Sequence, residues 1–154
     1  SSNGKDEAEF YLSVNPGEPL KPLGSVASGG EISRVMLAVK TVLADEEDTP
    51  TLIFDEIDTG ISGITAGKVG DRLRLIGKSR QVICITHLPQ IAATADHHFL
   101  IRKKAEGTSV RTDVEMLDEA ASVEELARLL GGANVTERVM ESAKELKELA
   151  KCER

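Results

Sequence analysis

Two adjacent carboxylates, Asp55 and Glu56, follow directly on a short apolar run formed by Leu52, Ile53 and Phe54. Such a run is typical of a buried strand, and two acids at its end lose solvation unless a positive group compensates them. Acids at the carboxyl ends of buried strands commonly hold a metal ion and activate water. We therefore expect Asp55 to orient Mg²⁺ and Glu56 to accept a proton from an attacking water. The alternative is that both acids only keep the strand end solvated.

A second candidate site lies upstream at Ser28, Gly29, Gly30 and Glu31, where a helical pattern begins. The N-terminus of a helix presents free backbone N–H groups and positive partial charge to an anion. Two consecutive glycines let the backbone approach a ligand closely, and the Ser28 hydroxyl could grip a γ-phosphate. The competing interpretation is an ordinary helix start with Ser28 as the N-cap. Together with the two acids, the pattern favours chemistry on a nucleoside triphosphate.

His87 ends a second apolar run, residues 81–86. If this strand lies beside residues 51–55, both strand ends open on the same crevice, and His87 can donate to a γ-phosphate there. In isolation His87 fits a loop position equally well. His97 and His98 begin another strand without a comparable partner, so we expect structural roles for them.

The sequence contains no phosphate-binding loop of the type G-x-x-x-x-G-K-[ST]. Residues 63–68 are one residue short of this pattern. Residues 77–79 carry Gly, Lys and Ser, but they follow a helix and precede a strand, which is the reverse of the required order. We expect neither segment to bind phosphate.

Hydrophobic spacing predicts the elements that position these groups. Apolar residues recur at helical spacing from Ile32 to Leu43 and again from Ala66 to Ile76, on either side of the first strand. Residues 81–86 are continuously apolar in their middle, as parallel strands covered on both faces tend to be. We expect an α/β fold with a mainly parallel sheet and flanking helices.

The ends of the chain add smaller elements. Residues 8–14 alternate as a half-buried strand before a loop rich in Pro and Gly. Residues 99–102 and 110–116 predict an antiparallel hairpin that caps the edge of the sheet. Two capping boxes predict a closing pair of helices with Gly131 and Gly132 between them: Ser122 with Glu125, and Asn134 with Glu137.

Composition sets the broad class of the 154-residue chain. Its length suits one domain, and a net charge of −7 opposes chain-wide attraction to nucleic acid. Two basic clusters, residues 72–80 and 102–104, are interpreted as solvated faces. Two cysteines, Cys84 and Cys152, indicate neither a disulfide framework nor a zinc site, and a reducing cytoplasm fits them best. No run approaches membrane-spanning length, and residues 1–7 are expected to be a polar leader or linker.

The ordered motifs resemble the ATPase head of the ATP-binding-cassette (ABC) family. Residues 28–31 resemble its signature, residues 51–56 its Walker B strand, residues 58–63 its D-loop, and His87 its switch histidine. Ala27 and Glu31 depart from the usual cassette pattern of Leu and Gln.

Longer matches at residues 15–19, 27–34 and 86–92 narrow the resemblance to a branch related to structural-maintenance-of-chromosomes (SMC) proteins, which acts in bacterial DNA double-strand-break repair by recombination. The resemblance covers residues 8–154. Because Walker A and the Q-loop are absent, it implies the C-terminal lobe of the head alone. A long antiparallel coiled coil would connect this lobe to an N-terminal lobe of the same protein, which carries Walker A, and the isolated chain is expected to be inactive.

The resemblance also implies a cytoplasmic, nucleoid-associated homodimer whose heads enclose two ATP molecules. Ser28, Gly29, Gly30 and Glu31 would face the ATP of the opposite protomer. We therefore expect Gly29 to lie on a distal rim, far from Glu56. DNA would be contacted by the full-length protein rather than by this acidic lobe.

Within its own protomer, Asp55 would bind Mg²⁺, while Glu56 and His87 would act on ATP. Asp58, Ser62 and Gly63 would form the D-loop. Two alternatives remain open: the head lobe of another SMC-like or ABC ATPase, and a non-catalytic module that binds a protein partner. Removal of the N-terminal lobe is expected to uncover a sheet edge and an apolar patch.

Overall fold

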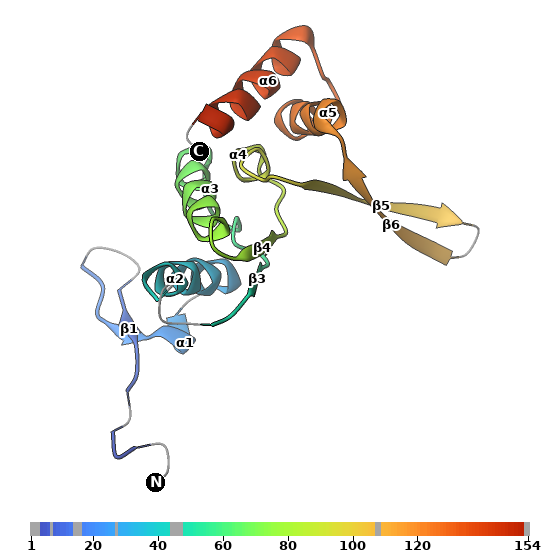
Figure 1. Cartoon of the computed structure of the whole chain (residues 1–154). Coiled ribbons are helices and arrows are strands. Elements are labelled where there is room, and N and C mark those ends of the chain that lie inside the picture. The colour runs from blue at the N-terminus through green and yellow to red at the C-terminus, as the bar shows by residue number, and fades with distance from the viewer. Residues whose placement is uncertain are drawn as a thin grey trace.

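A short parallel strand pair, β3 (Thr51–Phe54) and β4 (Gln81–Cys84), lies at the centre of the computed structural model (Figure 1). Phe54 pairs with Cys84, so both strands end at the same level. Helix α3 (Gly63–Gly77) connects them, which confirms the predicted order of strand, helix and strand. The structure describes residues 4–6, 8–13, 17–26, 28–43, 48–106 and 109–152, without the side chains of residues 26 and 106.

One face of this strand pair is packed and the other is bare. Helices α2 (Gly29–Val42) and α3 share a core cluster with the strands. On the opposite face Ile53 is 68% exposed, and its pairing partner Ile83 is exposed as well, together with Ile85. We expected cover on both faces of the strand pair, but the described residues cover only one of them. The packed cluster comprises Leu37, Leu52, Phe54, Ile57, Ala66, Val69, Leu73, Ile76 and Ile91.

The other described strands form separate antiparallel pairs and do not extend the parallel sheet. The α/β class is confirmed, but its parallel part is limited to β3 and β4 in the described residues. The predicted half-buried strand at residues 8–14 is shorter than expected, and Phe10 is exposed. Residues 14–16 lie outside the described part. The first antiparallel pair consists of β1 (Tyr11–Leu12) and β2 (Lys21–Pro22), and α1 (Leu23–Val26) follows it.

A long hairpin, β5 (His98–Glu106) and β6 (Ser109–Leu117), projects away from the strand pair (Figure 1). Its antiparallel pairing confirms the predicted hairpin. The prediction that it caps the edge of the parallel sheet is wrong, because it forms a sheet of its own. One of its faces carries exposed apolar side chains in paired positions, namely Phe99 with Met116 and Ile101 with Val114.

The predicted C-terminal helical pair is present as α5 (Glu119–Gly131) and α6 (Glu137–Cys152). Gly132, with a φ of 64°, ends α5, because this left-handed conformation suits glycine. A second core joins the pair to the short helix α4 (Pro89–Ala92). None of the helices among the described residues is long and apolar enough to cross a membrane. The buried residues of this core are Ala92, Ala93, Leu126, Ala127 and Ala143.

The caps of these two helices differ from the predicted capping boxes. Asp118 is the N-cap of α5, where its Oδ1 accepts from Ala121 N at 2.8 Å, and Ser122 is buried inside the helix. At α6 the Thr136 hydroxyl accepts from Val139 N at 3.4 Å, in place of Asn134. In both cases another short polar residue near the predicted cap takes the capping position.

His98 and Lys147 join the hairpin and α4 to the helical pair. His98 Nδ1 lies 2.9 Å from Ser122 Oγ, and burial together with the charge of Lys147 lowers the pKa of His98. Lys147 Nζ donates to Ala93 O at 3.4 Å and Ala95 O at 3.2 Å, beyond the end of α4. These contacts support the structural role predicted for His98.

The first core should dominate stability, and α3 offers a matched pair of isoleucines to test this. Ile76 is 2% exposed, whereas Ile64 on the same helix is 82% exposed. We expect Ile76→Ala to lower the free energy of unfolding by about 2 to 4 kcal/mol through loss of burial and creation of a cavity. Ile64→Ala should change it by less than about 0.5 kcal/mol. Urea unfolding of both variants measures the difference, and equal losses would contradict this packing.

Candidate functional site

The acids and the histidine lie at the same edge of the parallel strand pair. The pairing continues past the strand ends, since Ile85 N donates to Phe54 O at 3.0 Å. Asp55 and Glu56 follow β3 and are exposed, and His87 follows β4 and is exposed too. The prediction that these strand ends are neighbours is therefore confirmed.

Glu56 has an unusual backbone conformation. Its φ of 57° is the one positive φ of a non-glycine residue among the described residues. This left-handed conformation is costly for a residue with a Cβ atom, and such strain concentrates at functional sites. Glu56 N donates to Asp55 Oδ1 at 2.9 Å, which ties the two acids together.

Asp58 is a buried carboxylate beneath the site, only 4% exposed. Its Oδ2 accepts from Thr86 Oγ1 at 2.6 Å and from His87 N at 2.7 Å, and lies 2.9 Å from His87 Nδ1. Burial raises the pKa of Asp58, but the hydrogen bonds from Thr86 and His87 and the charge of His87 outweigh burial, so its pKa lies below the ordinary value. Asp58 thus stays ionised and joins the turn after β3 to the end of β4.

The contact with Asp58 decides what His87 can donate. If the Nδ1–H group of a neutral His87 donates to Asp58, Nε2 is left as an acceptor. The imidazolium form donates from both nitrogens. In this arrangement, a donated hydrogen bond from Nε2 to phosphate therefore comes from the doubly protonated ring.

The N-terminus of α2 is both an ordinary capped helix start and a candidate anion site, so the two interpretations of the Ser28 segment are compatible. Ser28 is the N-cap and forms a capping box with Glu31, whose Oε2 accepts from Ser28 N at 2.7 Å and Ser28 Oγ at 2.9 Å. These hydrogen bonds from Ser28 lower the pKa of Glu31. The amides of Gly29 and Gly30 have no acceptor in the described part of the chain, so the helix end remains able to take an anion.

The expectation that Gly29 lies far from Glu56 is wrong. A Cβ atom added at Gly29 would come within 2.4 Å of Glu56 Oε2. At Gly30 it would come within 2.8 Å of Glu56 O and 2.9 Å of Thr59 O, so a side chain there would collide with rigid backbone. The reason is that α2 packs directly on the turn after β3, and this close approach requires glycine.

Two residues that sequence reasoning did not assign hold α2 to this turn. Ser33 Oγ donates to Asp55 O at 2.9 Å. Arg34 Nη1 donates to Ile57 O at 3.0 Å and to Thr59 O at 2.9 Å. Thr86 is a third unassigned residue, and its polar side chain at the end of an apolar run was the available signal. Nothing in the sequence pairs Ser33 or Arg34 with residues more than twenty positions away.

The remaining predicted site residues, Ser62 and Gly63, lie at the start of α3. Ser62 is the N-cap of α3 without a side-chain cap bond, and Gly63 begins the helix close to Gln90. Residues 63–68 thus lie within a helix, and residues 77–79 lie at the C-terminal end of α3, where the helix dipole repels phosphate. Neither segment forms a loop between a strand and a helix, which is the context that a phosphate loop requires.

Glycine at position 56 should release the backbone strain. We expect Glu56→Gly to raise the free energy of unfolding by about 1 kcal/mol, because glycine adopts positive φ without steric cost. Glu56→Gln keeps the Cβ atom and should leave stability within about 0.5 kcal/mol of the parent chain. Thermal unfolding of the two variants makes the comparison, and a glycine variant less stable than the glutamine variant would refute the strain.

Replacing Thr86 by Val tests the buried carboxylate. Loss of the hydroxyl donor should lower the free energy of unfolding by about 1 to 3 kcal/mol at neutral pH. Because the pKa of Asp58 is lower when folded than its ordinary 3.8, its contribution is complete above that value and is lost as pH falls through the folded pKa. The deficit of Thr86→Val should therefore be smaller at a pH below 3.8 than at neutral pH. Urea unfolding at both pH values measures it.

The control for this substitution is Thr65→Val, at an exposed position on α3. It should leave stability within about 0.5 kcal/mol at either pH. A Thr86→Val deficit that does not change with pH would show that Asp58 is not the group concerned.

Curated sequences similar to this chain are DNA repair proteins named RecN. Identity is 53% over 148 residues with RecN of Halalkalibacterium halodurans, 49% over 143 residues with that of Vibrio cholerae, and 44% over 146 residues with that of Bacillus subtilis. The matches cover 96%, 93% and 95% of this chain, but 26%, 26% and 25% of the relatives. The chain therefore spans about a quarter of the length of the curated relatives it matches. No protein-family model matches it.

Among solved structures, one chain from a study of ATP-driven dimerization and DNA-stimulated activation of SMC ATPases aligns with a TM-score of 0.51. The alignment covers 77% of this chain and 70% of that chain, at 23% identity. At this identity the likeness establishes the fold, which is that of an SMC ATPase lobe. On the sequence similarity over nearly its whole length, the chain belongs to the RecN family and corresponds to its C-terminal part.

Proposed function

We propose that this segment is the C-terminal half of an ATP-binding and ATP-hydrolysing head. The head would dimerise on ATP and drive DNA double-strand-break repair by recombination in the bacterial cytoplasm, at the nucleoid. The observation that carries the proposal is the placement of Glu56 and His87 at adjacent strand ends above the buried Asp58. The name of the relatives, DNA repair protein RecN, supports the repair role.

Asp55 is the residue that would hold Mg²⁺. Magnesium is usually bound by one or two carboxylates, with phosphate oxygens and waters completing six ligands. The exposed Asp55 carboxylate fits such a site, and no group of three or more metal-binding side chains occurs among the described residues. Bound there, Mg²⁺ would neutralise phosphate charge.

Glu56 would accept the proton of the attacking water. Its carboxylate is exposed at the strand end, and its strained backbone supports a functional reason for keeping a glutamate at a position that favours glycine. A positioned general base contributes roughly 10²- to 10⁴-fold to a rate. His87 would donate to the γ-phosphate from Nε2 while Asp58 orients its ring through Nδ1.

The N-terminus of α2 would bind the triphosphate held by the opposite protomer. The amides of Gly29 and Gly30 and the positive end of the helix support this role. Glu56 Oε2 lies against Gly29, and two anions at one place repel each other. We therefore propose that the Glu56 side chain moves off Gly29 when nucleotide arrives, which links the signature to the catalytic base within each protomer.

The missing N-terminal lobe would cover the bare face of the parallel strand pair and supply the Walker A phosphate loop. Exposed Ile53, Ile83 and Ile85 form an apolar face that a stable protein normally covers. The chain spans about a quarter of the length of its relatives, which supports a covering segment in the remainder of such a protein. DNA would be bound by the full-length protein, because this segment has a net charge of −7.

The proposal is tested by steady-state ATP hydrolysis of the full-length protein that carries this segment. We expect Glu56→Gln to lower kcat by about 10²- to 10⁴-fold, because the general base is lost while the shape of the site is kept. Glu124→Gln on the exposed side of α5 is the matched control and should leave kcat unchanged. If both variants hydrolyse ATP at the parent rate, Glu56 is not the base.

The same preparation separates an ATPase head from a non-catalytic interaction module. Ser28→Arg places a long side chain where the opposite nucleotide would bind and should abolish ATP-dependent dimerisation, measured by analytical ultracentrifugation with and without ATP. If the protein is instead a module that binds a partner through another surface, the parent protein and the Ser28→Arg variant should associate equally well, with or without ATP. That outcome would exclude binding of the opposite protomer's nucleotide by the N-terminus of α2.

A further inference from the structure

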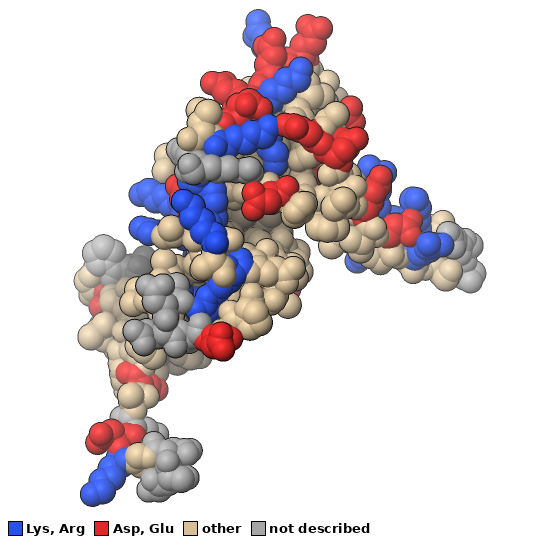
Figure 2. All heavy atoms as spheres, viewed as in Figure 1, with Lys and Arg blue, Asp and Glu red and all other residues tan. Residues whose placement is uncertain are grey.

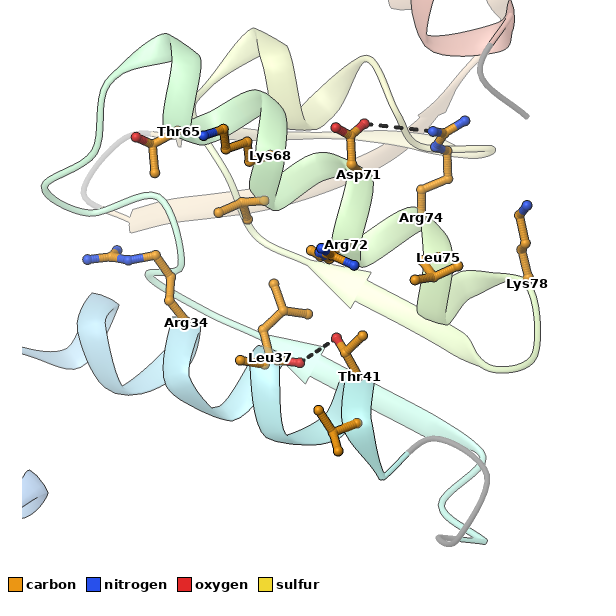
Figure 3. Close-up of a pocket in the computed structure, with 13 residues that line it drawn as sticks. Arg34, Leu37, Thr41, Thr65, Lys68, Asp71, Arg72, Arg74, Leu75 and Lys78 are labelled. Atoms are coloured by element: carbon orange, nitrogen blue, oxygen red, sulfur yellow. Dashed lines mark hydrogen bonds and ion pairs between the residues drawn. The ribbon is translucent and has the colours of Figure 1, made fainter. Parts of the chain in front are cut away.

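A groove of about 940 Å³ runs between α2 and α3, apart from the acids and His87 (Figure 3). The lining residues recur every three or four positions along each helix, so one face of each helix lines the groove. The α2 stripe is Arg34, Leu37, Ala38, Thr41 and Val42, and the α3 stripe includes Thr65, Lys68, Val69, Arg72, Leu75 and Lys78.

The rim of the groove is cationic on a chain that is acidic as a whole. Lys68, Arg72 and Lys78 are exposed and have no ion-pair partner in the described part of the chain. Asp71 is the single acid among the lining residues, and it faces Arg74 at 3.7 Å. Figure 2 shows Lys and Arg gathered along α3 toward α2, while over α5 and α6 acidic and basic side chains are mixed.

The floor of the groove is apolar. Leu37 and Val69 belong to the buried core and form its base. Farther along, Val42 is 81% exposed and Leu75 is exposed as well. Exposed apolar side chains beside a row of cations along α3 are a poor surface for the phosphate backbone of DNA, which is bound through charge and hydrogen bonds.

We propose that this groove binds an amphipathic helix with an acidic flank, presented by a separate partner protein. Two helices of 14 and 15 residues form walls about 20 Å long, enough for a helix of three to four turns. Leucine-like side chains would occupy the apolar floor, and Asp or Glu on the flank that faces α3 would meet Lys68 and the other cations along that helix.

The charge of the rim identifies a separate partner rather than the rest of the same protein. Permanent interfaces resemble a domain core, and the uncharged face formed by Ile53, Ile83 and Ile85 has that character. A charged rim beside an apolar floor is typical of an interface between separate proteins. The inference does not use Asp55, Glu56 or His87, so it stands or fails independently of ATP hydrolysis.

The test is binding of a labelled model peptide to the full-length protein by fluorescence anisotropy. The probe is a helical peptide of about 16 residues with Leu on one face and Glu on both flanks. We expect Lys68→Glu with Arg72→Glu to weaken binding about tenfold or more, because attraction at the rim becomes repulsion. The same double variant should bind a peptide with Lys in place of Glu more tightly than the parent protein does.

A control variant, a second groove variant and a crosslinking experiment test whether the peptide binds in the groove. Lys103→Glu with Lys144→Glu reverses two exposed charges outside the groove and should leave peptide affinity unchanged. Val42→Asp places an acid inside the groove at an exposed position that the fold does not depend on, and it should also weaken binding. A photo-crosslinker on the peptide should attach to α2 or α3, as read by mass spectrometry.

Three outcomes would overturn the proposal. The peptide could fail to bind, or the groove variants and the control variants could weaken it equally. Alternatively, a DNA duplex of about 20 base pairs could displace the peptide and lose affinity in the Lys68→Glu, Arg72→Glu variant, which would make the groove a nucleic-acid surface.

Discussion

The buried carboxylate of Asp58 is the interaction on which the candidate site depends. It accepts from Thr86 Oγ1 and His87 N and faces His87 Nδ1, so it fixes the turn after β3 to the residues that follow β4. An ionised group this deeply buried persists only when its hydrogen bonds outweigh the loss of solvation, as the lowered pKa of Asp58 indicates. Without this link, the parallel pairing that ends at Phe54 and Cys84 would not define where His87 lies relative to Glu56.

A second set of contacts places the N-terminus of α2 on the same turn. Ser33 and Arg34 donate to backbone carbonyls of residues 55, 57 and 59, and Gly30 has no room for a side chain there. The helix end that could bind an anion and the acid that could activate water therefore belong to one rigid unit.

The open faces of the molecule differ in chemistry. The bare side of the β3 and β4 pair is uncharged and apolar, and the hairpin likewise exposes Phe99 and Ile101. The groove between α2 and α3 has an apolar floor with exposed cations along its α3 side. Permanent interfaces resemble a domain core, whereas interfaces between separate proteins have a polar rim, so the two surfaces differ in the kind of contact that they suit.

The sequence by itself determined the order and type of the main elements around the site. Helical spacing located α2 and α3, and two apolar runs located β3 and β4, because these patterns reflect local periodicity and burial. The neighbouring positions of Glu56 and His87 followed from the rule that parallel strands joined by a helix end at the same edge. The predicted helix caps were misplaced by a few residues, because several short polar side chains near each end compete for the cap.

Only the tertiary structure decided how these elements meet. The contact of Gly29 with Glu56, the hydrogen bonds of Arg34 and the burial of Asp58 join residues far apart in sequence, and local patterns carry no signal for them. The position of the hairpin, apart from the parallel pair, could not be predicted either. The pattern of a strand indicates which of its faces is apolar, but not which surface that face covers. Close packing of α2 on the turn after β3 is a property of the folded chain, and it determined the geometry of the site.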